Sequence, residues 1–414
     1  MSETFEKKNF GIYIHLPYCL QKCPYCDFNS YAVGSVSSTG VSASAILPAE
    51  DDYVAALVEE IQLRSELFLD QSKLACRLEQ HCSSIFFGGG TPSLCKVESI
   101  EKLLVALKSK FKFSSNCEIT LETNPGTVSE ELGFEKLCGF KAAGINRISI
   151  GAQSFNPETL KFLGRIHDPE DTTKALTACR RAGFKNINLD LIFGSAGQTL
   201  ESWQTDLETA IALNPEHLSA YSLTIESNTE FGVRSKRGEV LTGDEDLHAD
   251  LFEYTQEALA QAGYPQYEIS NYARPGFQCV HNLNYWKRVP YLGLGAGAHG
   301  FLASEIRYSN IKAPKIYLER IRQGLLPEQM REELSDRQQQ IELIYLALRL
   351  EEGLSRDCLE RNFAASSRDK LLQILEEFAQ HRVVDRSDPA RFKLTRGGMR
   401  LADRIIQDLV STLL

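Results

Sequence analysis

Long apolar stretches are missing from this 414-residue sequence. No run reaches the roughly 18 apolar residues that a membrane-spanning helix needs, and the N-terminal MSETFEKKNF lacks the hydrophobic segment of a signal peptide. Positive charge is also in the minority, because 45 Lys and Arg stand against 55 Asp and Glu, a net charge of −10. This balance argues against a broad surface for nucleic acid or for an anionic membrane. We therefore expect a cytoplasmic protein without a nucleic-acid partner.

The sequence also lacks the paired cysteines of a disulfide framework. The total of 11 cysteines is odd, and all but three are scattered singly. In a chain without a signal peptide such cysteines are expected to be reduced, several of them in the core. Only Cys19, Cys23 and Cys26 have ligand spacing, within HLPYCLQKCPYCDF (15–28).

What the sequence does contain is a repeated phrase of helix end, glycine and β-branched strand. The glycine of the phrase is Gly144, Gly183 or Gly263, each suited to a left-handed helix end. A period near about 40 residues is typical of consecutive βα units. The expected strands are 11–16, 83–88, 117–122, 146–151, 186–192 and 216–223. We predict an α/β fold with a partial (β/α)6-type barrel; YEIS (267–270) is a candidate seventh strand, and a doubly wound open sheet is the alternative.

Two segments depart from this pattern. Residues 31–52 are rich in Ser, Gly and Ala and indicate a flexible loop inserted in the first unit. From about residue 312 the sequence is charged and helical, with a hairpin-like piece at 383–394, an order that resembles a winged helix. We expect domains at 1–311 and 312–414, the second a mainly helical packing module and not a nucleic-acid binder.

The cysteine motif follows the first predicted strand directly. It therefore lies at the carboxyl mouth of the barrel, where such folds keep their sites. Three thiolates spaced C-x3-C-x2-C can hold a cubic iron–sulfur cluster from one loop and leave one iron open. Zinc is the competing interpretation, with His15 as a nearby further ligand, although structural zinc takes four ligands and usually pairs of C-x2-C. The cluster is favoured.

At this point the sequence resembles the radical S-adenosylmethionine (SAM) superfamily, which carries the same cysteine spacing. The motifs IYIHLPYC, FFGGGTPSL, LETNP, RISIGAQSF, LGRIH, NLDLIFG and YEISNYA follow in the order of the oxygen-independent coproporphyrinogen oxidase group, over about residues 10 to 310. The resemblance implies a [4Fe-4S] cluster on Cys19, Cys23 and Cys26, SAM on the open iron, and an electron donor for the cluster. In such proteins the cofactor carries the demanding chemistry and the chain positions it.

The resemblance also implies which residues contact SAM. Glycines at a strand end allow close backbone approach, carboxylates can take the ammonium or ribose hydroxyls, and Arg can pair with the SAM carboxylate. A buried acid such as Asp190 needs a partner in any case. The candidates are Tyr13, Tyr25, Gly89, Gly90, Thr91, Glu122, Gln153, Arg165 and Asp190.

A further motif, HNLNYW (281–286), sets an imidazole beside two flat aromatic side chains. This composition suits heme, with His281 as axial ligand and Tyr285 and Trp286 stacking on the macrocycle. A packed loop is the plain structural alternative. The pattern H-N-x-x-Y-W resembles HemW-type heme chaperones, relatives of the oxidase group that bind heme. His299 is a second candidate ligand.

The resemblance leaves two functions to compare. The first is a heme chaperone that transfers heme to an acceptor protein, and the second is an oxygen-independent coproporphyrinogen III oxidase, which decarboxylates two propionates. Phe28 occupies the place of the oxidase's fourth cysteine, only 18 residues precede Cys19, and the oxidase lacks H-N-x-x-Y-W. These features favour the chaperone. GSAGQT (194–199) lacks the Leu-Pro usual in relatives, for which we expect a small change of turn. The resemblance allows a homodimer without requiring one.

Overall fold

The structure is a computed structural model that describes residues 9–33, 47–75, 80–303 and 305–413. Most of the insertion expected at 31–52, residues 34–46, lies outside the described residues. Within the described ranges, no helix is long and apolar enough to cross a membrane.

The predicted partial barrel is confirmed. Its six expected strands form a continuous parallel array in which each strand pairs with the next one along the chain. They are β1 (Asn9–Leu16), β4 (His81–Gly89), β5 (Phe113–Thr123), β6 (Arg147–Gln153), β7 (Ile187–Phe193) and β8 (His217–Ser222).

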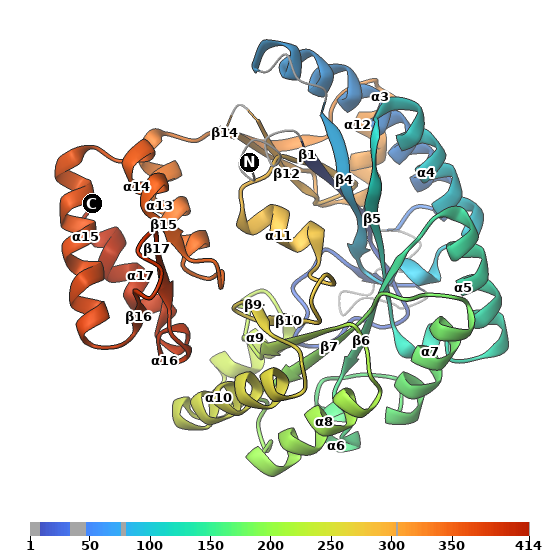
Figure 1. Ribbon diagram of the computed structural model, residues 1–414. Helices are drawn as coiled ribbons and strands as arrows, with labels where there is room; N and C mark the ends of the chain where they lie inside the picture. The colour runs from blue at the N-terminus through green and yellow to red at the C-terminus, as the bar shows by residue number, and fades with distance from the viewer. Residues whose placement is uncertain (1–8, 34–46, 76–79, 304, 414) are drawn as a thin grey trace.

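Helices cover the outer side of this arc of strands (Figure 1). The main ones are α3 (Glu50–Ala75), α4 (Val97–Lys110), α5 (Glu131–Ala143), α7 (Pro169–Arg181), α8 (Leu200–Ala212) and α10 (Glu245–Gln261). The glycines of the repeated phrase, Gly144, Gly183 and Gly263, all have positive φ, as a left-handed helix end requires. Shorter elements are β2 (Tyr18–Cys19), β3 (Tyr31–Ala32), η1 (Pro92–Leu94), η2 (Pro125–Thr127), α6 (Pro157–Phe162) and α9 (Glu230–Lys236).

The candidate seventh strand does not continue the parallel array. The segment forms β9 (Gln266–Glu268), and β10 (Asn271–Ala273) lies antiparallel between β9 and β8. A tight reversal between β9 and β10 leaves no room for the helix that a parallel neighbour would need. The next helix, α11 (Val280–Trp286), lies on the inner side of the arc (Figure 1).

The sheet also extends beyond β1, which the sequence analysis did not anticipate. There β11 (Tyr291–Leu294) pairs parallel with β1, and β12 (His299–Leu302), β13 (Ile306–Asn310) and β14 (Glu328–Glu333) follow antiparallel. The sheet has twelve strands in all within the described chain. The expected boundary at 311/312 is therefore too early, because β14 completes this sheet and α12 (Pro314–Arg322) buries Tyr317 in the barrel core.

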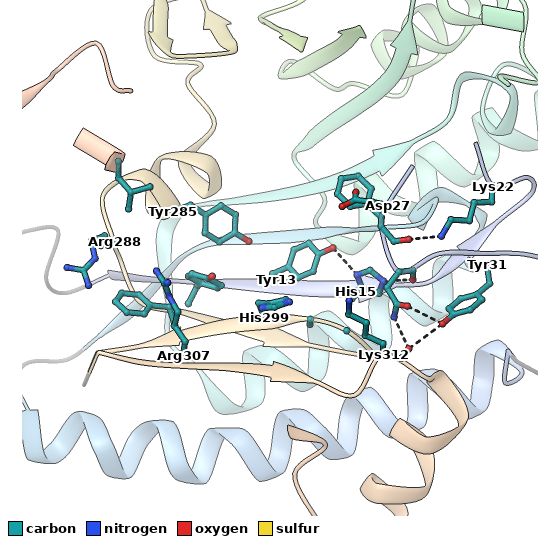
Figure 2. A pocket seen from close by; sticks show the side chains of 17 residues that line it. Tyr13, His15, Lys22, Asp27, Tyr31, Tyr285, Arg288, His299, Arg307 and Lys312 are labelled. Carbon is teal, nitrogen blue, oxygen red and sulfur yellow. Dashed lines mark hydrogen bonds between the residues drawn. The ribbon is translucent and has the colours of Figure 1, made fainter. Parts of the chain in front are cut away.

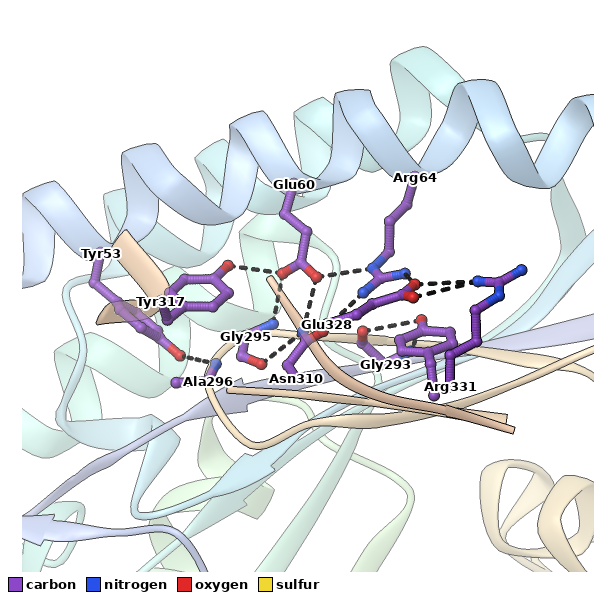
Figure 3. A network of polar contacts seen from close by, with 11 residues as sticks. Tyr53, Glu60, Arg64, Gly293, Gly295, Ala296, Asn310, Tyr317, Glu328 and Arg331 are labelled. Carbon is purple, nitrogen blue, oxygen red and sulfur yellow. Dashed lines mark hydrogen bonds and ion pairs between the residues drawn. The ribbon is translucent and has the colours of Figure 1, made fainter. Parts of the chain in front are cut away.

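A buried polar network joins α3 to these added strands (Figure 3). Glu60, fully buried, accepts hydrogen bonds from Arg64 Nε at 2.8 Å, Gly295 N–H at 2.8 Å, Asn310 Nδ2 at 2.8 Å and the Tyr317 hydroxyl at 2.7 Å. A buried carboxylate is tolerated only where such partners replace water. The network therefore fixes β11 and β13 against α3.

The C-terminal part has its own hydrophobic core. Helices α13 (Asp336–Ala347), α14 (Arg356–Asn362), α15 (Ala365–Gln380), α16 (Arg396–Arg400) and α17 (Ala402–Ser411) accompany the strands β15 (Leu354–Ser355), β16 (Val384–Asp385) and β17 (Arg391–Leu394). The predicted hairpin is present as the antiparallel pair β16 and β17, and β15 adds a third strand to it. This mainly helical unit begins after β14.

Candidate functional site

The three motif cysteines lie on the loop that leaves β1, at the carboxyl end of the barrel strands. Cys19 ends β2 and its Sγ accepts a hydrogen bond from Thr91 Oγ1 at 3.7 Å, while Cys23 Sγ accepts one from Arg165 Nη1 at 3.5 Å. The Cys26 N–H donates to the Cys23 carbonyl at 3.1 Å, which turns the loop back on itself. Burial raises the pKa of the Cys19 and Cys26 thiols. All three cysteines line one cavity of about 410 Å³, which we call the cluster cavity.

The described residues around the cysteine loop do not form a site for a single zinc ion with His15 as a further ligand. His15 is buried, and both its ring nitrogens are engaged, Nδ1 with the Tyr13 hydroxyl at 3.0 Å and Nε2 with the Asn29 carbonyl at 2.9 Å. Burial lowers the pKa of His15 to about 4. No three His, Cys, Asp or Glu side chains of the described chain converge as one metal ion would need. The ligands of a cubic cluster bind different irons and need not converge in this way.

The glycines after β4 allow the cysteine loop to pack closely. A Cβ at Gly90 would lie 2.5 Å from the Tyr18 carbonyl oxygen, and one at Gly89, where φ is +108°, would lie 2.4 Å from the His15 ring. Gly90 N–H donates to the Leu16 carbonyl at 2.8 Å. The cluster cavity and this close packing therefore both depend on the absence of side chains at these two positions.

Two carboxylates face the cluster cavity from β5 and β7. Glu122 Oε2 accepts a hydrogen bond from Gly89 N–H at 3.2 Å, and Asp190 accepts from Ser149 Oγ and Asn188 Nδ2, each at 2.8 Å. Burial, and then the charge of Asp190, raises the pKa of Glu122 to about 8. Among the described residues no cation lies within 4.0 Å of the Glu122 carboxylate, although the charge of Arg147 opposes the rise of its pKa, and an ammonium group in the cavity would supply a direct partner.

Polar atoms without partners also face this cavity. Gln153 holds a left-handed backbone with φ of 65°, a strained conformation of the kind found at ligand sites. Arg165 donates from Nη2 to the Gly151 carbonyl at 3.0 Å, yet within the described chain its buried Nε has no hydrogen-bond partner, and neither has the buried Oδ1 of Asn124. Such orphaned groups are uncommon in a finished core. They fit a bound polar ligand such as SAM.

The structure brings together all the SAM candidates except Tyr13. Those that line the cluster cavity are Tyr25, Gly89, Gly90, Thr91, Glu122, Gln153, Arg165 and Asp190. Tyr25 packs against Phe231 with ring centroids 6.4 Å apart. Tyr13 lies beside the stacked rings of Phe86 and His281 and borders different cavities. The expected contact of Tyr13 with SAM is therefore not supported by its position.

His281, the expected axial ligand of heme, is buried inside the barrel. Its Nδ1 is 2.8 Å from Ser84 Oγ on β4, and its Nε2 is 2.8 Å from the hydroxyl of Tyr285, one helical turn further along α11. Burial, and then Arg147, lowers the pKa of His281 to about 3. The cavity that it borders measures about 140 Å³, whereas small-ligand pockets typically run to about 300–1,000 Å³. The geometry thus disfavours His281 as a ligand in this conformation.

The other two residues of the heme motif, Tyr285 and Trp286, differ in whether they line a cavity. Tyr285 borders the narrow cavity of His281 and also a larger one, described next. Trp286 is absent from the residues that line either cavity, and its buried Nε1 has no hydrogen-bond partner in the part of the chain that the structure describes. Stacking of Trp286 on a macrocycle is therefore not supported, because Trp286 lines neither cavity.

A cavity of about 630 Å³ opens between β1, the cysteine loop, β11–β13 and α13 (Figure 2). We call it the aromatic cavity, after the rings of Tyr13, Tyr285, Tyr291 and Phe301 in its lining. His299, Lys22, Arg288, Arg307 and Lys312 add nitrogen groups. Lys22, Asp27 and Phe28 of the cysteine loop line both this cavity and the cluster cavity. Two spaces large enough for ligands therefore lie on either side of one loop.

The sequence analysis missed Arg147, which is buried on the inner face of β6 and borders the narrow cavity. Its Nε has no partner, and no ion pair of its guanidinium lies within 4.0 Å among the described residues. The sequence does carry a signal for Arg147, a charged residue within the strand NRISIG. Arg147 stands two positions before Ser149, and residues two apart lie on the same face of a strand. Burial acts to lower the pKa of Arg147, but the neighbouring Cys279, Glu118, Tyr267 and Asp190 raise it overall.

Comparisons with known proteins show which family the chain is similar to. Residues 13–210 match the Radical SAM superfamily. The chain is 46% identical to the heme chaperone HemW of Haemophilus influenzae over 74% of this chain and 75% of that one, and 33% identical to that of Lactococcus lactis over 97% of both. Coproporphyrinogen III oxidase of Escherichia coli matches the fold with a TM-score of 0.77 at 24% identity, over 99% of this chain and 90% of that one.

The partial barrel, the three-cysteine loop and the family match define a radical SAM protein. A [4Fe-4S] cluster and SAM are the cofactors that this superfamily implies. Within it, the chain belongs to the family of the heme chaperone HemW.

Proposed function

We propose that this protein is a heme chaperone, which binds heme and passes it to an acceptor protein. The observation that carries the proposal is the 33% identity to a heme chaperone over 97% of both chains. A cavity of about 630 Å³ beside the cluster loop supports it, because a chaperone of this family needs space for a large flat ligand apart from the SAM site. An electron donor for the cluster, a cytoplasmic location and a homodimer belong to the same hypothesis.

Cys19, Cys23 and Cys26 would hold the [4Fe-4S] cluster, and the residues lining the cluster cavity would hold SAM. Glu122 and Asp190 supply carboxylates for the ammonium and ribose groups, and Arg165 supplies a cation near Cys23. When bound, the cluster and SAM supply one-electron chemistry. The chain's own part is to place the ligands: the tight contacts of Gly89 and Gly90 hold the loop, and Thr91 orients the Cys19 sulfur.

Oxygen-independent coproporphyrinogen III oxidation is the second candidate, favoured by the likeness of fold to the Escherichia coli oxidase. Phe28 stands where the oxidase pattern has a fourth cysteine, and its side chain is 63% exposed at the border of the two cavities. A thiol at this point could serve the chemistry of a substrate next to the cluster, and phenylalanine cannot. The chaperone is therefore the better supported function.

Anaerobic reconstitution followed by two measurements tests the proposal. We expect about four irons per chain, a spectral change on adding SAM, and a Soret band on titration with heme. Cys19→Ala should lose most of the iron, while Cys138→Ala, a change at an exposed cysteine of α5, should retain it. An anaerobic assay with coproporphyrinogen III, SAM and reductant should yield no protoporphyrinogen; its formation would assign the chain to the oxidase class. Absence of heme binding by an intact, cluster-loaded protein would overturn the chaperone function.

A further inference from the structure

His299 is the imidazole best placed to meet a ligand in the aromatic cavity. It begins β12 with its side chain exposed, whereas the next three residues of the strand are buried. Its backbone is fixed by pairing with Ser309 on β13. Among the described residues, no side-chain hydrogen bond engages its ring, unlike both nitrogens of His281. A strand thus presents a free imidazole to the cavity.

The protonation state of His299 suits a metal ligand. Partial burial, followed by the charges of Lys312 and Arg307, lowers the pKa of His299. The ring is therefore neutral near pH 7, and only a neutral imidazole nitrogen can coordinate iron. Both cations line the same cavity as the imidazole.

Charge in the aromatic cavity is opposite to that of the chain. The protein has a net charge of −10, yet the Lys, Arg, Asp and Glu residues of the lining are Lys22, Arg288, Arg307 and Lys312 against Asp27 alone. From outside the lining, Glu342 approaches Arg307 at 2.5 Å and Arg288 at 3.4 Å, and Glu305 also pairs with Arg288. Lys22 donates to the carbonyls of Phe28 and Ser30.

Lys312 is the cation that these partners leave available. Its side chain is exposed, and no carboxylate lies within 4.0 Å of its ammonium among the described residues. Its own backbone carbonyl accepts from Asn29 Nδ2 at 2.9 Å, which fixes the residue at the cavity rim. An anionic group of the occupant would therefore meet Lys312 first, and then the partly exposed Arg307.

Aromatic rings form the remaining wall. Tyr285 and Tyr291 pack edge to face with centroids 4.6 Å apart, and Arg288 and Arg307 lie over the ring of Phe301 at 5.4 and 5.7 Å. Figure 2 shows Tyr285, His299 and Arg307 around the same space. Flat rings, a free neutral imidazole and cations at the rim together match a flat metal macrocycle that carries carboxylates.

We propose that the aromatic cavity is the heme-binding site, with His299 as the axial ligand and Lys312 and Arg307 as partners of the propionates. The proposal rests on the chaperone function above and deepens it by naming the site. His281 is then a positioning residue, which holds Tyr285 at the cavity wall through the 2.8 Å contact of Nε2 with the hydroxyl. Because Lys22, Asp27 and Phe28 border both cavities, the heme lies directly across the cysteine loop from the cluster.

Titration of the full-length, cluster-loaded protein with ferric heme tests the ligand. We expect His299→Ala to weaken binding at least about tenfold, equivalent to about 1.4 kcal/mol, and to change the EPR signature of the heme iron. Free imidazole should restore the wild-type signature in His299→Ala, an effect that a merely structural role would not produce. His381→Ala, a change at an exposed histidine in the C-terminal unit, should bind as the wild type does.

The carboxylate partners are tested with heme dimethyl ester, which lacks free propionates. Lys312→Met should weaken binding of heme several-fold and leave binding of the ester unchanged; equal weakening of both would overturn the role of Lys312. Wild-type affinity and spectrum in His299→Ala, with loss of heme in Tyr285→Phe or His281→Ala, would overturn the assignment of the ligand while the chaperone function stands. Failure of the wild type to bind either porphyrin would instead overturn the function itself.

Discussion

The Nε2 of His281 lies 2.8 Å from the hydroxyl of Tyr285, and its Nδ1 lies 2.8 Å from Ser84 Oγ. The imidazole therefore connects two turns of α11 to β4, inside the barrel and away from solvent. Asn284 adds a hydrogen bond to Ser84 Oγ at 3.0 Å. The H-N-x-x-Y-W motif thus acts first as an anchor that directs Tyr285 toward the aromatic cavity.

Removal of this anchor should cost stability more than heme affinity. His281→Ala leaves a void, removes the partner of the Tyr285 hydroxyl and leaves Ser84 Oγ with Asn284 alone, so we expect the free energy of unfolding to fall by about 2–4 kcal/mol. Heme affinity should fall less than in His299→Ala. Urea unfolding and heme titration of both variants measure the two effects. A stable His281→Ala protein that binds no heme would contradict the anchoring role.

A methyl group at Gly90 should displace the cysteine loop. The added Cβ would lie 2.5 Å from the Tyr18 carbonyl and 2.9 Å from that of Leu16, both backbone atoms that cannot turn aside. We expect Gly90→Ala to reconstitute less than half of the wild-type iron, measured by iron analysis and by absorbance of the cluster. Gly397→Ala is the matched control, because its Cβ meets nothing nearer than 4.0 Å and should leave iron content unchanged. Full iron in Gly90→Ala would mean that the loop tolerates the shift.

The six parallel strands could be predicted from the sequence because each βα unit is formed by a continuous stretch of the chain. Strands β6 and β7, for example, each follow a helix and a glycine, Gly144 and Gly183. The extension β11–β14 escaped prediction, since Tyr291–Leu294 pairs with residues some 280 positions earlier in β1, a register that no local pattern encodes. The strand β12, which begins at His299, depends on that distant pairing through β11.

The candidate site also has a part that the sequence could predict and a part that it could not. Cysteine spacing and strand-end positions were enough to bring the cluster and SAM candidates together around one cavity. The sequence could not show whether a histidine ring nitrogen is free, because this depends on a hydrogen-bond partner far away along the chain. Ser84 lies 197 positions from His281 and occupies its Nδ1, and nothing in HNLNYW reveals this. His299, without such a partner in the described structure, has the weaker sequence signal and the more open position.

Glu60 should be among the most sensitive positions for stability. It carries the negative charge of a buried network with Arg64, Asn310 and Tyr317. We expect Glu60→Gln to lower the free energy of unfolding by about 3–5 kcal/mol, the usual effect of removing one partner of a buried ion pair. Asp51→Asn, on the same helix, breaks an exposed pair with Lys96 and should leave stability nearly unchanged. Chemical denaturation of both variants provides the comparison, and equal effects would refute the importance of burial.

The raised pKa of Glu122 predicts a specific dependence of stability on pH. The carboxyl group titrates near about 8 when folded, against 4.5 for an ordinary glutamate, so the folded chain holds a proton that the unfolded chain has lost between these values. The group therefore makes the SAM-free protein less stable as pH rises through this range. Buried His15, His167 and His281 act with opposite sign, because their pKa values are lowered from 6.5 to about 4, 4 and 3.

The window from about pH 7.5 to 8 separates the two effects best, because one unit above 6.5 only about a tenth of the histidines in the unfolded chain still hold a proton, and those of the folded chain are already neutral. In this range we expect the free energy of unfolding of the wild type to fall with pH, by at most about 1.4 kcal/mol per unit. Glu122→Gln keeps an acceptor for Gly89 N–H but has no proton to lose, so its slope should be clearly shallower. The control Glu98→Gln, at an exposed position of α4, should retain the wild-type slope. Identical slopes in Glu122→Gln and wild type would show that Glu122 is already ionised in the folded protein, with a cation in the barrel, Arg147 foremost, neutralising its charge.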